Sequence, residues 1–181
     1  MTQTSQIRSS TPDDFQNILT IYPLAFPDEE LRPLVTDLLT TVSDRLSLVA
    51  ERDGEIIGHA IFTSGWIEGS DAKLGLLGPL TVTPKAQKQG IGTRLIDEGR
   101  TVLSAAGFAK ILLLGDTEYY VRHGFAQETD IDAPYDMPDS WKYAWQGYAL
   151  NEGPAAKGRL VLPDAWMKPE YWMPTSPDQG A

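Results

Sequence analysis

The sequence contains no cysteine, so it can form neither a disulfide nor a thiolate metal site, and it offers no thiol nucleophile. It also lacks any run of about eighteen apolar residues, so we expect no membrane span. Its first ten residues, MTQTSQIRSS, lack the apolar stretch of a signal peptide. We therefore expect a cytoplasmic protein with no membrane partner.

Basic residues are scarce as well, with 15 Lys and Arg against 25 Asp and Glu, a formal net charge of −10. This balance argues against a broad nucleic-acid surface, so no nucleic-acid partner is expected. A length of 181 residues with 41 % hydrophobic and 22 % charged residues suits one globular domain. We assign it to residues 1–165, with residues 166–181 as an irregular tail, containing proline and tryptophan, that packs on the domain.

One stretch, residues 76–103, organises the rest of the chain. Its first part, 76–82, is apolar and favours a strand, which Thr83 and Pro84 end because proline has no N–H for a ladder. The segment QKQGIG at 87–92 follows, and then an apolar stripe with helical spacing. A strand, a glycine-bearing turn and a helix aim unpaired N–H groups and the positive end of the helix dipole at one point. That arrangement favours a phosphate-binding turn.

Charge and spacing refine this interpretation. Gly90 and Gly92 let the backbone approach an anion, and Lys85 and Lys88 add positive charge in an acidic chain. The alternative is a tight turn that only joins strand to helix. The segment is not a P-loop, and it is not a dinucleotide fingerprint either, because Leu95 stands where the third glycine would be.

Three motifs in this order resemble the GNAT superfamily of acyl-CoA-dependent N-acetyltransferases. The segment at 87–92 resembles its (Gln/Arg)-x-x-Gly-x-(Gly/Ala) motif, LGPLTV at 77–82 its central strand, and YVRHGF at 120–125 its Tyr-x-x-x-Gly-Phe signature. The resemblance implies an α/β fold with a mixed sheet of about six to seven strands, helices on both faces and splayed central parallel strands. It also implies acetyl-CoA as acyl donor, no metal, and an amine acceptor that is a small molecule or a peptide.

The resemblance assigns roles to particular residues. The backbone of 80–82 would pair with the pantetheine arm and supply an oxyanion donor, the turn would hold the pyrophosphate, and Tyr120 would protonate the coenzyme A sulfur, with Tyr119 as its rival. The expected coenzyme-binding residues are Leu80, Thr81, Val82, Gln87, Lys88, Gln89, Gly90, Ile91, Gly92, Thr93 and Tyr120. The general base stays open among Glu68, Asp116 and Glu118.

The remaining elements follow from pattern. We expect a strand at 5–8, helices from Pro12 and over 28–41, and a hairpin of 46–51 with 55–64 around Asp53-Gly54. A parallel strand at 110–114 and a short helix after Asp116, which Asp116 would cap, come next. An extended loop at 127–139 should precede a strand at 141–150, which pairs with 159–162 and offers an edge for a homodimer.

Two sets of residues carry weaker expectations. His59 lies in the middle of an apolar strand and reads as a structural histidine, since no carboxylate or cysteine has the spacing of a metal ligand. Phe26, Glu29 and Glu30 are candidates for acceptor contacts. The leading function is acetyl or short-acyl transfer to a primary amine. The alternatives are an acyl-CoA-sensing module without catalysis and, disfavoured by charge, a toxin that acetylates aminoacyl-tRNA.

Overall fold

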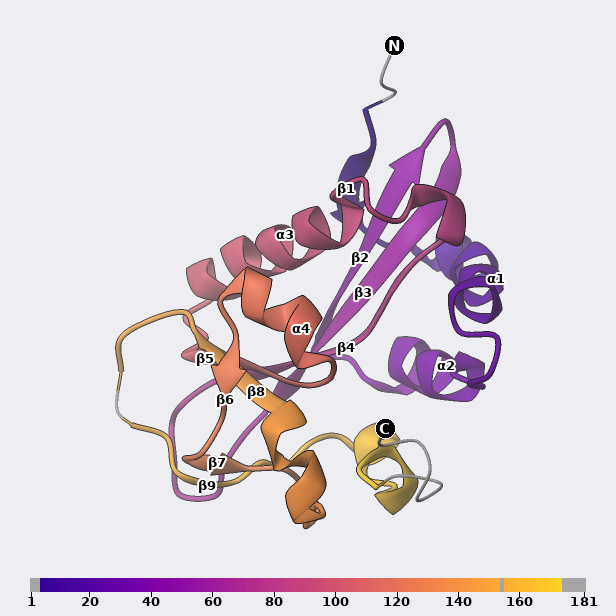
Figure 1. The fold of residues 1–181 in the computed structure, drawn as a ribbon. Helices are drawn as coiled ribbons and strands as arrows, with labels where there is room; N and C mark the ends of the chain where they lie inside the picture. The colour runs from indigo at the N-terminus through magenta and orange to yellow at the C-terminus, as the bar shows by residue number, and fades with distance from the viewer. Residues whose placement is uncertain (1–3, 154, 174–181) are drawn as a thin grey trace. The chain divides into compact units, whose positions relative to one another are not determined.

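The fold is a mixed α/β arrangement, which the computed structural model describes for residues 4–153 and 155–173 (Figure 1). Seven strands form one sheet in the order β1-β2-β3-β4-β5-β8-β6, and β7 and β9 form a second, small sheet. The strands are β1 Gln6–Ser9, β2 Arg45–Arg52, β3 Glu55–Gly65, β4 Leu74–Val82, β5 Lys110–Leu114, β6 Ala126–Gln127, β7 Ile131–Asp132, β8 Trp145–Ala149 and β9 Gly158–Arg159. The helices are α1 Phe15–Ala25, α2 Arg32–Thr41, α3 Ile91–Ala105 and α4 Thr117–Tyr120. The fold class predicted from the sequence is confirmed.

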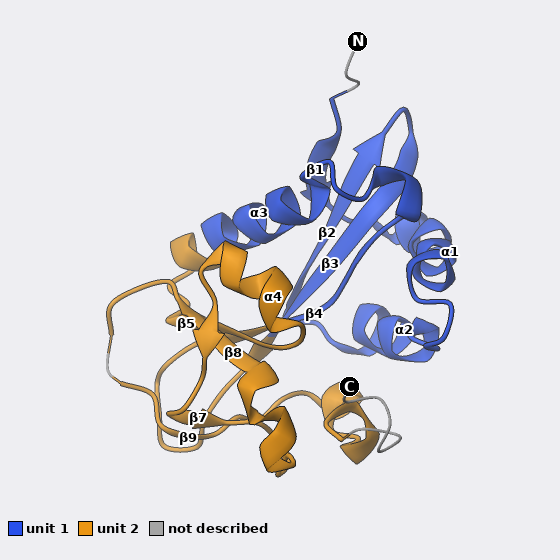
Figure 2. Ribbon diagram, viewed as in Figure 1, with its two compact units in different colours: residues 1–63, 77–102 blue, residues 64–76, 103–181 orange. Residues whose placement is uncertain are grey.

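The chain forms two compact units (Figure 2), one of residues 1–63 and 77–102 and one of residues 64–76 and 103–181. In the first unit, β3 separates two layers of helices. Gly58 lies against Ile91 of α3, while its neighbour His59 bonds to Tyr22 of α1. Since successive side chains of a strand point to opposite faces, β3 carries α3 on one face and α1 on the other (Figure 1).

The hairpin and the first helices follow the sequence closely, with one correction. Asp53 and Gly54 have φ values of 54° and 80°, as the predicted two-residue turn requires. The expected helix at 28–41 begins only at Arg32. Pro33 explains the difference, because proline is tolerated in the first turn of a helix, where its missing N–H would have no partner, but not further inside.

In the second unit, the start of β4 pairs in parallel with β5, from Leu74 opposite Lys110 to Leu76 opposite Leu112. Strand β8 pairs antiparallel with both β5 and β6. The expected strand at 141–150 begins only at Trp145, because a 3₁₀ helix over Asp139–Ala144 follows Pro138. Its expected partner at 159–162 is also wrong, since β9 pairs with β7 inside the predicted loop and Val161 bridges to Trp66.

The last described residues pack in the second unit. Trp172 is 1 % exposed, its indole N–H donates to the carbonyl of Trp166, and its ring packs edge-on against Trp145. The expected tail extends over residues 174–181, which lie outside the described residues. No helix within residues 4–153 and 155–173 is long and apolar enough to cross a membrane.

Candidate active site

The turn at residues 87–92, which we call the phosphate turn, lies in the first unit between β4 and α3. Where β4 ends, the N–H of Thr83 donates to the carbonyl of Ile57 at 2.9 Å. Two glutamine side chains then fold back on the backbone: Gln87 Nε2 donates to the carbonyl of Val82 at 3.0 Å and Gln89 Nε2 to that of Lys85 at 2.8 Å. Side-chain hydrogen bonds therefore define the shape of this turn in addition to its backbone.

The backbone of the phosphate turn has the conformation that its glycine content suggests. Lys88 and Gly90 have φ values of 60° and 78°, in the left-handed region. At Gly90 a Cβ would meet no atom within 4 Å, so glycine is needed for conformation and not for space. Helix α3 follows at once with 15 residues, and its first N–H groups have no acceptor within the helix.

Positive charge collects at this turn. Lys85 and Lys88 are exposed, and neither forms an ion pair within the described part of the chain. Both therefore remain available to an anion, beside the positive end of the α3 dipole. The turn has the backbone donors, the dipole and the cations of a phosphate site.

The other residues expected to contact the coenzyme on this unit are placed as follows. Leu80, Thr81 and Val82 are the last three residues of β4; Leu80 and Val82 are half-buried and Thr81 is 1 % exposed. The Thr81 hydroxyl is buried and has no hydrogen-bond partner among the described residues. Ile91 is the first residue of α3 and is buried, and Gly92 and Thr93 continue the first turn of the helix. Their contacts with a coenzyme stay a prediction.

Tyr120 lies in the second unit, in the short helix α4. Asp116 caps this helix, as expected, by accepting a hydrogen bond from the N–H of Glu118 at 2.8 Å. The Tyr120 ring packs edge-on against Phe125 and Tyr119, and a Cβ on Gly115 would lie 2.8 Å from its Cε2 atom. Gly115 therefore leaves the space that this ring fills.

Burial raises the pKa of Tyr120 well above its ordinary value, and the nearby Tyr119 and Asp116 raise it further. Burial also raises the pKa of Tyr119. The Tyr120 hydroxyl makes no hydrogen bond with the residues that the structure describes. At neutral pH it is thus a protonated donor with its hydrogen uncommitted.

The Tyr-x-x-x-Gly-Phe signature has a local structural reason. Gly124 follows a 3₁₀ turn with φ 78°, and a Cβ there would lie 3.1 Å from the ring of Tyr148. Phe125 is 1 % exposed, and its ring packs edge-on against Tyr120 and at a tilt against Tyr148. The glycine ends the helix and the phenylalanine anchors the tyrosine, so the motif fixes the ring that carries the phenol.

The other candidates have mainly structural partners. His59 is fully buried, with Nδ1 2.7 Å from the Tyr22 hydroxyl and Nε2 2.8 Å from the Ser47 hydroxyl, so its predicted structural role is confirmed. Burial lowers its pKa to about 3. Among the possible bases, Asp116 is the cap described above, whereas Glu68 and Glu118 are exposed. Of the possible acceptor contacts, Glu30 is paired with Arg32.

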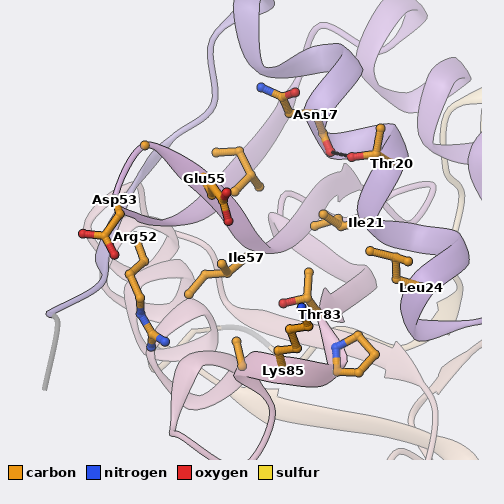
Figure 3. A pocket seen from close by; sticks show the side chains of 14 residues that line it. Asn17, Thr20, Ile21, Leu24, Arg52, Asp53, Glu55, Ile57, Thr83 and Lys85 are labelled. Atoms are coloured by element: carbon orange, nitrogen blue, oxygen red, sulfur yellow. Dashed lines mark hydrogen bonds between the residues drawn. The ribbon is translucent and has the colours of Figure 1, made fainter.

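Sequence patterns gave no sign of a cavity of about 790 Å³ in the first unit (Figure 3). It lies between α1, the tip of the β2–β3 hairpin and the chain just before the phosphate turn. Apolar side chains such as Ile21 and Leu24 line it together with charged ones such as Arg52 and Lys85 (Figure 3). These segments are far apart in sequence and carry no common motif, so nothing in the sequence could have joined them.

The sequence is similar to a known family and to known proteins. A family model described as the acetyltransferase (GNAT) family matches residues 13–125. An uncharacterised N-acetyltransferase of Escherichia coli K12, YjhQ, is 36 % identical over 148 residues, which cover 78 % of this chain and 82 % of YjhQ. A second one, YhbS, is 32 % identical over 136 residues, covering 75 % and 79 % of the two chains.

Solved structures of acetyltransferases have the same fold. The E. coli YhbS structure, in complex with CoA, superposes with a TM-score of 0.83 at 26 % identity and covers 93 % of this chain and 94 % of YhbS. A GNAT family acetyltransferase from Brucella melitensis, in complex with acetyl-CoA, has a TM-score of 0.71 at 30 % identity, covering 90 % of this chain and 98 % of its own. The family model spans more than half of the sequence, and the chain therefore belongs to the GNAT family of acetyltransferases.

Proposed function

We propose that this protein is an N-acetyltransferase that moves an acetyl or other short acyl group from acetyl-CoA to a primary amine of a small molecule or polypeptide. The observation that carries the proposal is the phosphate turn. It combines a left-handed Gly90, the free N–H groups at the start of α3 and two lysines that form no ion pair with the described residues, in a chain of net charge −10. These features suit the pyrophosphate of a coenzyme A molecule.

Relatives support the choice of donor. The structurally similar YhbS holds CoA, and the Brucella acetyltransferase holds acetyl-CoA. In this proposal residues 87–93 bind the pyrophosphate, and the backbone of Leu80, Thr81 and Val82 pairs with the pantetheine arm. A cytoplasmic location, where acetyl-CoA is available, is part of the same proposal. A metal is not needed, because neither attack of the amine nor departure of the thiolate requires a Lewis acid.

The chemistry assigned to Tyr120 follows from its environment. When the amine attacks the thioester carbon, the C–S bond breaks and the sulfur leaves as a thiolate. A phenol that burial keeps protonated can donate its hydrogen to that sulfur. The pKa of this phenol lies above that of a thiol, so complete proton transfer from Tyr120 to a solvated thiolate is thermodynamically unfavourable. The transfer becomes favourable only where the thiolate is also desolvated, because desolvation raises the pKa of the thiol. Hydrogen-bond donation that strengthens as the thiolate forms is therefore the role that we assign to Tyr120.

The acceptor in this proposal is a primary amine. An amine must be neutral to attack, and an acidic chain favours cationic or neutral acceptors over nucleic acid. The general base stays unassigned, because exposed carboxylates such as Glu68 and Glu118 could each act through water. A homodimer also remains part of the proposal, but not through the edge of β8 that the sequence suggested, because β8 pairs with β5 on one side and β6 on the other.

The first experiment is titration calorimetry of the protein with acetyl-CoA, with NAD and ATP as controls, followed by a screen of amines for release of free thiol. We expect micromolar binding of acetyl-CoA alone and thiol release with at least one class of amine. Binding without release by any amine, including amine-bearing peptides, would favour the acyl-CoA-sensing alternative. No binding of acetyl-CoA would refute the proposal.

The Tyr120→Phe variant tests the catalytic assignment. We expect turnover to fall by about two orders of magnitude, the lower end of the range for loss of one general acid, while acetyl-CoA still binds. Equal turnover of the variant and the wild type across the pH range would remove Tyr120 from the mechanism, and Tyr119→Phe would then be the next variant to measure.

A further inference from the structure

Arg52, the last residue of β2 beside the hairpin tip, contacts the side chain of Gln89 in the phosphate turn. Its Nη2 atom donates to Oε1 of Gln89 at 3.0 Å, across a separation of 37 residues. Gln89 in turn donates from Nε2 to the carbonyl of Lys85 at 2.8 Å. The amide of Gln89 is therefore used on both sides, as an acceptor from the hairpin and as a donor to the turn.

The hairpin is built in a way that aims Arg52 at this turn. Ala50 pairs with Gly58, but Glu51 pairs with Ile56, so that Ile57 is an extra residue in β3. Such a bulge bends a strand and changes where the residues beyond it point. The carbonyl of Ile57 accepts the N–H of Thr83, the first residue after β4. The hairpin and the chain between β4 and α3 are thus joined at two points, one through the backbone at Thr83 and one through Arg52.

Arg52 has no competing side-chain partner among the residues that the structure describes. It is half-buried, it forms no ion pair with any residue in 4–153 or 155–173, and its Nε atom is buried without an acceptor. Gln89 therefore meets no competition for this guanidinium from the other residues that the structure describes. The contact with Gln89 is its only hydrogen bond within the described part of the chain.

We infer that Arg52 is a positioning residue for coenzyme binding: through Gln89 it holds the phosphate turn in the conformation that presents its N–H groups to the pyrophosphate. This inference rests on the proposed function and adds to it a second element, the β2–β3 hairpin, on which coenzyme affinity depends. Lys88 and Gly90, on either side of Gln89, have left-handed φ values, so a turn released from this contact has many other conformations open to it.

The test compares the dissociation constants of CoA and 3′-dephospho-CoA, which share the pyrophosphate and differ in the phosphate on the ribose. For Arg52→Met we expect both constants to rise by the same factor, about tenfold for loss of one charge-assisted hydrogen bond, with kcat at saturating acetyl-CoA unchanged. A rise for CoA alone would mean that Arg52 contacts the 3′-phosphate directly and would overturn the positioning role.

Two further variants separate position from charge. Gln89→Met leaves the net charge unchanged and should weaken both ligands at least as much as Arg52→Met. The double variant should bind no more weakly than Gln89→Met alone, because the two residues act through one contact. Additive losses, or a Gln89→Met variant with wild-type affinity, would refute the inference.

The charge control is Arg159→Met, which removes an arginine from the other unit, where it pairs with Asp136. It should leave the affinity for both ligands as in the wild type. Thermal unfolding of each variant establishes that it is folded. If the wild type binds CoA and the Arg52 variants bind equally well, only this inference fails, whereas a wild type that does not bind CoA refutes the proposed function itself.

Discussion

Gly99 of α3 lies directly against the ring of Phe62 in β3: a Cβ on this glycine would lie 2.1 Å from the Cζ atom of the ring. Both residues belong to the first unit, and this contact sets how closely α3 approaches the sheet that carries the phosphate turn. Helical glycine is otherwise unfavourable by about 1 kcal/mol relative to alanine. The close contact with Phe62 is the reason that glycine stands here.

We predict that Gly99→Ala lowers the free energy of unfolding by about 1–3 kcal/mol, as overpacking of a core does, despite the gain in helix propensity. Urea denaturation measures the change. Gly153→Ala, where a Cβ meets nothing within 4 Å, is the matched control and should be neutral. Phe62→Leu should recover part of the loss in the double variant. A Gly99→Ala protein as stable as the wild type would show that the ring moves aside freely.

Acid should destabilise the protein through His59. Its pKa falls from an ordinary 6.5 to about 3 through burial, so below pH 6.5 the unfolded state binds a proton that the folded state does not. Stability is therefore highest above pH 6.5 and falls as the pH drops toward 3, with a limiting slope of about 1.4 kcal/mol per pH unit.

Urea unfolding between pH 6.5 and 4.5 isolates this effect. Arg8 lowers the pKa of Asp14 below its ordinary 3.8 by hydrogen bonding, so the contribution of that carboxylate is lost only at more acidic pH. His59→Gln should reduce overall stability and flatten the pH dependence within this window. An unchanged slope in the variant would assign the pH dependence to other groups.

Glu128 is a buried carboxylate that organises the second unit. Its Oε1 accepts from the N–H groups of Thr129, Asp130 and Ile131 at 2.8–3.1 Å, and its Oε2 lies 2.5 Å from the Nζ atom of Lys110. We predict that Glu128→Gln lowers the free energy of unfolding by about 2–4 kcal/mol, because Lys110 and part of the backbone lose their anionic acceptor.

Chemical denaturation measures that loss, and Asp136→Asn is its control. Asp136 pairs with Arg159 at the surface, where an ion pair contributes only about 0–1 kcal/mol. Equal and small effects of the two substitutions would show that the backbone around Glu128 finds water instead.

Gly115 should matter for turnover through Tyr120. An alanine Cβ would lie 2.8 Å from the ring, so Gly115→Ala must displace it. Misplacing a catalytic group by about 1 Å can reduce rates up to a hundredfold, and we expect kcat to fall about tenfold with little change in KM for acetyl-CoA. In a Tyr120→Phe background the same substitution should have almost no further effect on kcat. A full tenfold loss in that background would show that Gly115 acts independently of the phenol.

Local signals explain most of what the sequence predicted. The turn at Asp53-Gly54, the glycine-bearing turn before α3 and the cap at Asp116 each depend on a few neighbouring residues, so pattern alone was enough. The alternating aromatic pattern from residue 141 suggested a strand, but this start was wrong. The carbonyl of Pro138 accepts the N–H of Trp141 and closes a 3₁₀ turn instead.

Long-range contacts explain what it missed. The pairing of β9 with β7 joins two strands of two residues each, which are too short to show a strand pattern in the sequence. The Arg52–Gln89 contact and the cavity beside it join segments that are far apart in the sequence. None of these contacts produces a periodic pattern in the sequence, because each depends on which distant residues the sheet brings together.

The bulge at Ile57 limits how this hairpin can change during evolution. Between Arg52 and Ile57 the chain length decides on which face Arg52 emerges, since each inserted or deleted residue turns a strand over by one position. Substitutions at the turn itself disturb little, provided that the left-handed conformation of its two residues is kept. Among relatives that keep an arginine and a glutamine at these two places, the number of residues between the arginine and the bulge should therefore be fixed more tightly than their identity.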